Sequence, residues 1–384
     1  MSWPIPKLKR VEYPTPLSLR IWIPALIAIA TGIAAAVLLL WPQGQPTQTA
    51  EFWSALIGVP LIACAVVFGL SLGRWEDVQI DAEEDELEQQ RLDELWRDWT
   101  RRHVSVADAA AFLPVTENIA SLASARIDLP MARDRAIDFG WAKDRSDVFR
   151  RIKLLERVAT RFADVVRIRQ EVMVTLMLDD VSLEKADVWK RRAGHILRRV
   201  VPGVTFLIEA RSASGGAQWL AQQVDQISTV AQLVIAAQMW SETEANQKFS
   251  EGAAAFLIDP DGKQAGLIYR PMVTMPDALD GSLAQMMQMQ VHPDGLTQVW
   301  STGCEDGSAA IRSALTVDPK NPITEHLLDG FLGIPGPASG WIAVAVAMEA
   351  MRGNGPQMVA WREPASEPLH LCMVSPVPQE ETTV

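Results

Sequence analysis

The chain has 384 residues, a formal net charge of −12 and three cysteines. This acidic balance argues against nucleic acid as the main partner, because phosphate backbones are bound by basic surfaces. Cys64, Cys304 and Cys372 lie far apart without the spacing of metal ligands, so the sequence predicts neither a disulfide scaffold nor a metal site.

Two uncharged apolar runs follow one another near the start of the chain, at residues 21–40 and 52–72. A helix of about twenty residues crosses a bilayer core of about 30 Å. The two runs therefore predict a transmembrane hairpin within residues 1–78, which would attach the protein to a membrane through two spans.

Basic residues indicate how this hairpin is oriented. Lys7, Lys9, Arg10 and Arg20 precede the first run and Arg74 follows the second, whereas the linker between the runs contains no Lys or Arg. The positive-inside rule then places both chain termini in the cytoplasm. We expect the membrane to be a bacterial inner membrane.

A highly charged segment at residues 79–103 follows the second run. Acidic residues crowd its start, and Arg97, Arg101 and Arg102 lie near its end. This distribution complements the dipole of a helix. We predict a helix that leads from the membrane to a soluble domain.

Strand-like runs alternate with helical segments after residue 104. The runs at 172–180, 204–210, 231–239 and 252–260 are apolar and are separated by charged or turn-forming segments. Such alternation predicts an α/β fold with buried strands. A turn at residues 259–262 divides the region into two halves, 104–262 and 263–384, while residues 112–149 show no assignable pattern.

The stretch GIPGPASGWIAVAVAMEAM, residues 333–351, contains three glycines before an apolar helical segment. Gly333, Gly336 and Gly340 match neither of the common phosphate-binding glycine motifs, so no nucleotide cofactor is expected. The apolar part is too short to cross a membrane. Its small residues favour a tightly buried helix.

Three segments together resemble the β-ketoacyl synthases of the thiolase-like superfamily. The segment at residues 250–258 is similar to their strand entry, residues 333–351 to their late loop and helix, and RSASGG at 211–216 to their nucleophile turn. The resemblance rests on the order and spacing of these segments, and it covers residues 172–376. It implies a layered αβαβα domain, which in this superfamily commonly forms a homodimer.

The same resemblance places the catalytic positions. The nucleophilic cysteine falls on Ser212, or alternatively on Ser214, and the late-loop histidine falls on Ile334. A serine can act as a nucleophile when a base lies beside it, but it can equally cap the helix that follows. Because neither position keeps the residue of the family, we predict an inactive relative of these enzymes, without a cofactor.

Membrane-anchored proteins of this kind resemble thiolase-like accessory proteins of type VI secretion. That resemblance implies a non-catalytic adaptor whose protein partner is a secreted effector or the secretion machinery. Two alternatives stay open. One is a membrane-associated acyl-transfer or condensing enzyme with a serine nucleophile, and the other is a structural subunit of a membrane complex.

Overall fold

A computed structural model describes residues 3–6, 11–42, 46–115, 131–226, 228–240, 248–260, 264–290, 295–304, 311–313, 323–351 and 355–377. The chain forms two compact units. One comprises Pro6–Leu95, and the other joins Met1–Ile5 to Trp96–Val384. We call the second unit the α/β domain.

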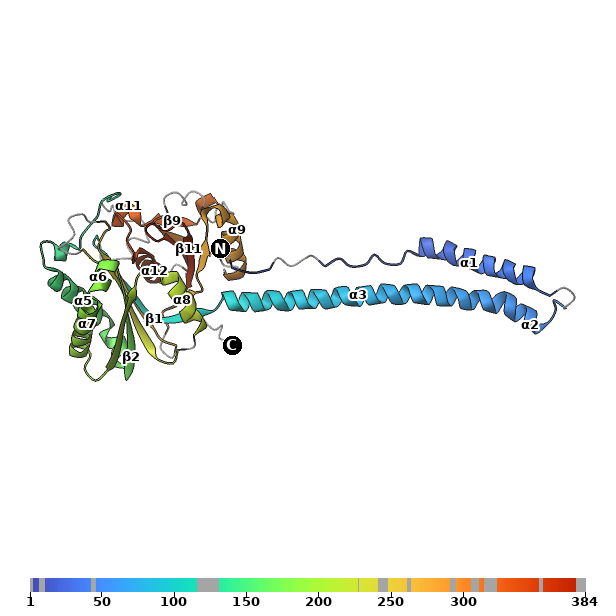
Figure 1. Ribbon diagram of the computed structural model, residues 1–384, viewed down its shortest axis with the longest axis horizontal. Coiled ribbons are helices and arrows are strands. Elements are labelled where there is room, and N and C mark those ends of the chain that lie inside the picture. Colours follow the sequence, from blue (N-terminus) through green and yellow to red (C-terminus); the bar gives the residue numbers. More distant parts are fainter. Residues whose placement is uncertain are drawn as a thin grey trace, which may run out of the picture. The chain divides into compact units, whose positions relative to one another are not determined.

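The unit Pro6–Leu95 is helical (Figure 1). It contains α1 (Leu19–Leu40), α2 (Ala50–Trp53), the π-helical turn η1 (Ser54–Gly58) and most of α3 (Val59–Thr100). Two of its helices, Leu19–Leu40 and Ala50–Thr100, are long and apolar enough to cross a membrane. Within this unit α1 contacts α3, since the rings of Trp22 and Phe68 meet edge to face at 5.8 Å.

The charged segment at residues 79–103 is not a separate helix. It continues α3 as far as Thr100 and is followed by β1. The reason is local, because residues 74–100 contain neither glycine nor proline and so nothing interrupts the helix. The last turn of α3 belongs to the α/β domain.

The α/β domain is built from two halves with the same strand order. The first half contains β1 (His103–Phe112), β2 (Glu171–Leu178), β3 (Thr205–Ser212), β4 (Ala231–Gln238) and β5 (Gly252–Ile258). Their spatial order is β3-β2-β4-β5-β1, in which β3, β2 and β4 are parallel and β5 is antiparallel to both of its neighbours.

The second half repeats this arrangement. It contains β6 (Gly266–Tyr269), β8 (Gln298–Thr302), β9 (Thr324–Leu327), β10 (Gln357–Arg362) and β11 (Leu369–Ser375), in the order β9-β8-β10-β11-β6. The short strand β7 (Met272–Thr274) pairs with β11. Strands β1 and β6 pair antiparallel and join the halves, and the predicted division at residue 262 falls between β5 and β6.

Helices form three layers with the sheet between them. One outer layer is α5 (Asp147–Arg167) and α7 (Ala186–Val200), which pack on the first half, and α6 (Asp180–Glu184) lies beside them. The other is α9 (Leu279–Gln290), which packs on the second half. The structure also contains the short helices η2 (Gly140–Ala142), η3 (Pro276–Ala278) and α11 (Asp329–Leu332).

The central layer consists of α8 (Gly216–Asp225) and α12 (Ser339–Ala350). These helices pack between the inner faces of the two halves, and every residue of α12 except Glu349 is buried. In each half the central helix follows the third strand and precedes the fourth. The layered αβαβα fold predicted from the sequence is therefore confirmed.

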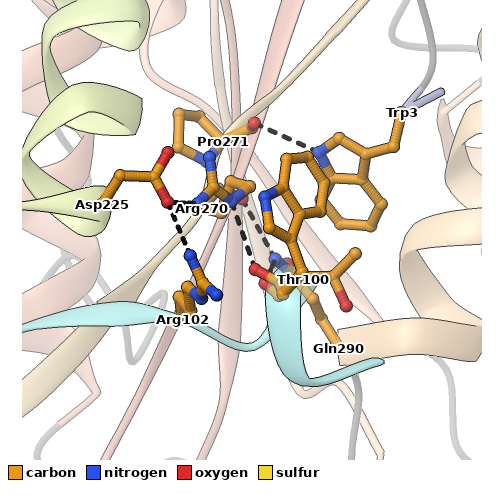
Figure 2. Close-up of polar contacts among 8 residues, drawn as sticks. Trp3, Thr100, Arg102, Asp225, Arg270, Pro271 and Gln290 are labelled. Atoms are coloured by element: carbon orange, nitrogen blue, oxygen red, sulfur yellow. Dashed lines mark hydrogen bonds and ion pairs between the residues drawn. The ribbon is translucent and has the colours of Figure 1, made fainter. Parts of the chain in front are cut away.

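The last turn of α3 is fixed to the α/β domain by Arg270 (Figure 2). The Arg270 guanidinium lies 4.0 Å from the ring centroid of Trp99, and its Nε donates to the Trp99 carbonyl at 3.2 Å. Gln290 donates from Nε2 to the Thr100 carbonyl at 2.6 Å. These donors satisfy carbonyls that the end of a helix leaves unpaired.

The same arginine reaches the end of α8. Asp225, the last residue of that helix, forms ion pairs with Arg270 and, at 3.1 Å, with Arg102. The first residues of the chain lie here too, because the Trp3 indole donates to the Pro271 carbonyl at 3.4 Å. One end of α8 is thus held against the start of β1 and the end of α3 (Figure 2).

Candidate functional site

The other end of α8 meets the start of α12 at a small cavity. Its volume is about 10 Å³, roughly the space of one oxygen-sized atom. The lining residues are Ala213, Gly216, Leu220, Pro337, Gly340, Trp341, Val344, Trp361 and Glu363.

The turn between β3 and α8 decides which side chain faces this cavity. Ala213 lines it and is 1% exposed. Ser212 accepts a hydrogen bond from the backbone N–H of Ser214 at 3.3 Å, so its hydroxyl helps to hold the turn. Ser214 is exposed and does not line the cavity. Gly215 has φ +80°, a left-handed conformation that favours glycine.

A carboxylate occupies the N-terminus of α8. Glu363, which follows β10, accepts a hydrogen bond through Oε1 from the backbone N–H of Gly215 at 2.7 Å. The first N–H groups of a helix have no partner within it, and its dipole favours negative charge there. The site therefore binds an anionic oxygen, and sequence reasoning missed Glu363 because it lies 148 residues away from Gly215.

Two tryptophans close the cavity from the side of the second half. A Cβ on Gly216 would lie 2.5 Å from Trp341 Nε1, and a Cβ on Gly340 would lie 2.5 Å from the Trp361 ring. The two glycines thus allow the aromatic rings to contact the helix backbones. The sequence predicted tight packing at Gly340, and the structure shows that the Trp361 ring packs against this glycine.

His370 stacks on Trp361 from the neighbouring strand β11, with ring centroids 5.2 Å apart. Burial lowers the pKa of His370, while the negative charge of Glu363 acts in the opposite direction. An imidazole with a lowered pKa is neutral near pH 7. Among the described residues, no group of three His, Cys, Asp or Glu side chains is placed to hold a metal ion.

The late loop lies at a separate cavity of the fold. Ile334 lines a cavity of about 20 Å³ that Ser212 does not touch, and its carbonyl accepts from the backbone N–H of Ser250 at 2.8 Å. Gln238 holds the loop by accepting from the Ala338 N–H at 2.8 Å. The structure therefore does not bring Ser212 and Ile334 together in one cavity.

A buried carboxylate lies next to this loop. Glu251, whose side chain is 0% exposed, accepts from the backbone N–H groups of Phe139 at 2.9 Å and Trp240 at 3.0 Å, and pairs with Arg150 at 2.6 Å. Burial raises the pKa of Glu251 against the opposing effect of these partners. Because all these partners belong to the α/β domain, Glu251 joins the segments that contain Phe139, Arg150 and Trp240.

No protein-family model matches the sequence, and no curated relative matches it. Solved structures are similar to it. The peroxisomal 3-ketoacyl-CoA thiolase of Saccharomyces cerevisiae, described as five layers built from two core domains of identical topology, has 10% identity and a TM-score of 0.47, covering 72% of this chain and 98% of the thiolase.

Two further structures are similar over the same region. A tetronic acid condensing enzyme has 14% identity and a TM-score of 0.48, covering 71% of this chain and 100% of its own. The 3-oxoacyl-[acyl-carrier-protein] synthase III of Aquifex aeolicus has 13% identity and a TM-score of 0.41, covering 71% and 99%.

These structures have the thiolase-like fold that the sequence predicted, and they correct the predicted function. Two of them are named as a condensing enzyme and a 3-oxoacyl synthase, which contradicts the predicted non-catalytic adaptor and agrees instead with the alternative of an acyl-condensing enzyme. Nothing in them supports a link to type VI secretion. Because all three TM-scores are below 0.5, the likeness assigns neither a substrate nor a residue role to this chain.

Proposed function

We propose that this chain is a membrane-associated acyl-transfer enzyme of the condensing type, with Ser214 as its nucleophile. The observation that supports it most is the start of α8. There an N–H group already binds a carboxylate oxygen, and a cavity with room for one atom lies beside the exposed serine turn. Such a site stabilises a negatively charged oxygen.

The chemistry uses residues of this turn. The Ser214 hydroxyl attacks an acyl carbonyl carbon and gives its proton to the carboxylate of Glu363, which accepts from the backbone N–H of the next residue, Gly215. The carbonyl oxygen becomes an oxyanion at the helix N-terminus. When the bond to the leaving group breaks, Glu363 returns the proton to that group and the acyl chain remains on Ser214.

The substrate class follows from the approach to the site. Since this cavity has a volume of only about 10 Å³, the acyl chain stays outside it and its carbonyl oxygen enters. The similar solved structures include enzymes named for acyl-CoA and acyl-carrier-protein substrates. We therefore propose an acyl thioester as the substrate.

Mass spectrometry of the purified full-length chain in detergent tests this function. After incubation with an acyl-CoA or a 4-nitrophenyl ester, we expect one acyl adduct on Ser214. Ser214→Ala should abolish the adduct, whereas the matched variant Ser212→Ala should retain it, because the Ser212 hydroxyl accepts one long backbone hydrogen bond of 3.3 Å and does not line the cavity. A wild-type chain that forms no adduct with either reagent refutes the proposal.

Loss of catalysis is the second candidate, and Ala213 is the observation that favours it. Where a buried nucleophile would face the cavity, this chain has a methyl group. At the late loop it has Ile334 in place of an acid–base side chain. An inactive chain would show no adduct in the same experiment.

We also propose that the unit Pro6–Leu95 is a membrane hairpin with both ends on the cytoplasmic side of a bacterial inner membrane. Its two connections both lead to the α/β domain, since Met1–Ile5 and Trp96–Val384 form one unit, and this supports an even number of crossings. The basic residues flanking the apolar helices support the same orientation. Reporter fusions at residue 45 and at the C-terminus should report opposite sides of the membrane.

A homodimer through β3 is a further proposal. β3 is an edge strand that pairs with β2 in the described sheet, and Leu207 on it is 50% exposed. Unpaired strand edges favour pairing with another strand. Native mass spectrometry should show a dimer, and Leu207→Lys should shift it towards monomer.

A further inference from the structure

Trp341 carries a buried hydrogen-bond donor without an acceptor. The residue is 6% exposed and lies in the first turn of α12. Among the described residues, none accepts a hydrogen bond from its Nε1. Buried donors are nearly always paired, so an unpaired one calls for an acceptor that arrives from elsewhere.

The position of this donor indicates where that acceptor binds. Trp341 Nε1 lies over Gly216, the first residue of α8, so close that a Cβ there would be 2.5 Å away. Trp341 and Gly216 line the same cavity of about 10 Å³, together with Ala213 and Glu363. A side-chain donor, a helix N-terminus and space for one atom therefore coincide.

We propose that the Trp341 indole N–H is an oxyanion donor at this site. The inference rests on the proposed acyl transfer and names a further catalytic residue for it. The carbonyl oxygen of the acyl group enters the cavity and accepts from Trp341 Nε1 as its negative charge develops. Gly216 is required because any side chain there would displace the indole.

The Gly215 N–H supplies a second donor during the reaction. In the resting site it donates to the Glu363 carboxylate at 2.7 Å. When Glu363 takes the proton of Ser214 it loses its negative charge and becomes a weaker acceptor. The oxyanion forms at the same moment, so the Gly215 N–H donates a hydrogen bond to the oxyanion in place of Glu363.

Replacing the indole by a ring without an N–H tests the donor. In Trp341→Phe, full-length and in detergent, we expect acylation of Ser214 by a 4-nitrophenyl ester to slow by about 100-fold, as for other oxyanion donors. Trp219→Phe is the matched control. Trp219 contacts Trp341 edge to face at 5.5 Å but does not line the cavity, so its rate should stay within about threefold of wild type.

A second measurement reports the hydrogen bond directly. An alkyl boronic acid forms a tetrahedral anion on a reactive serine. We expect the indole proton of Trp341, identified by its loss in Trp341→Phe, to move downfield when the boronate binds to wild type and to stay unmoved in Ser214→Ala.

The outcomes separate the two proposals. If wild type is acylated and Trp341→Phe reacts equally fast, or if the indole proton does not move, the cavity holds a water molecule only and the inference is overturned. If wild type is never acylated, the proposed function fails and the donor role fails with it. A folded Trp341→Phe, shown by an unchanged near-ultraviolet spectrum of the other tryptophans, keeps the rate comparison valid.

Discussion

Replacing Arg270 by alanine should destabilise the α/β domain by about 3–4 kcal/mol. The Arg270 side chain is 5% exposed and contacts the face of Trp99 at 4.0 Å. A desolvated cation–π contact contributes about 2 kcal/mol. The Trp99 carbonyl also loses its charged donor and keeps only the 3.4 Å hydrogen bond from the Arg102 backbone N–H, a loss of about 1–2 kcal/mol.

The loss of the ion pair itself adds little to this estimate. Asp225 is 44% exposed and keeps Arg102 at 3.1 Å, so its carboxylate does not become a buried, unpaired charge. Arg102→Ala is the matched control, because it removes the exposed partner of the same carboxylate. We expect it to cost less than about 1 kcal/mol.

Urea denaturation of the full-length chain in detergent, followed by near-ultraviolet circular dichroism, measures both variants. The signal reports the packed tryptophans of the α/β domain, and the free energy of unfolding follows from the midpoint and slope. Equal losses of unfolding free energy in Arg270→Ala and Arg102→Ala would refute the reasoning. They would mean that the exposed ion pair with Asp225, and not the buried contact with Trp99, stabilises the α/β domain.

Three further predictions concern the interior. Gly216→Ala should destabilise the domain by about 1–3 kcal/mol in the same assay, because its Cβ would lie 2.5 Å from Trp341, whereas Gly281→Ala, with open space around it, should not. Burial raises the pKa of Glu251, so the native state keeps a proton that the unfolded state releases, and the free energy of unfolding should fall as pH rises above about 4.5. Glu251→Gln should reduce this pH dependence when the free energy of unfolding is measured by denaturation between pH 4 and 8. Burial raises the pKa of Cys304 to about 12, so iodoacetamide at pH 8 should alkylate it in urea and spare it in the folded protein, and rapid labelling without urea would contradict its burial.

Local patterns were sufficient to predict most elements. The apolar runs at residues 172–180, 204–210, 231–239 and 252–260 correspond to β2, β3, β4 and β5. β2, β4 and β5 are mostly buried, as their apolar side chains predict, whereas the edge strand β3 has no buried residue, so the prediction of a buried strand is wrong there. The segment at 112–149 gave no prediction, and much of it, residues 116–130, lies outside the described residues.

The candidate site could be located from the sequence but not described. The glycines and serines of RSASGG marked the turn before α8, and the small residues of 333–351 marked the tight packing of α12. The sequence could not predict which residue of the turn faces the cavity, because a shift of one residue at the end of a strand moves a side chain to the opposite face. Ala213 faces inward, and Ser212 and Ser214 do not.

The sequence by itself determined the two apolar helices, the α/β class and the division into two halves, because each depends on hydrophobic periodicity within a short segment. The tertiary structure alone decided that Glu363 binds the N-terminus of α8 and that the Trp341 indole lies over Gly216. These contacts join residues more than a hundred positions apart. Packing of the two halves around their central helices creates them, and no local pattern records that packing.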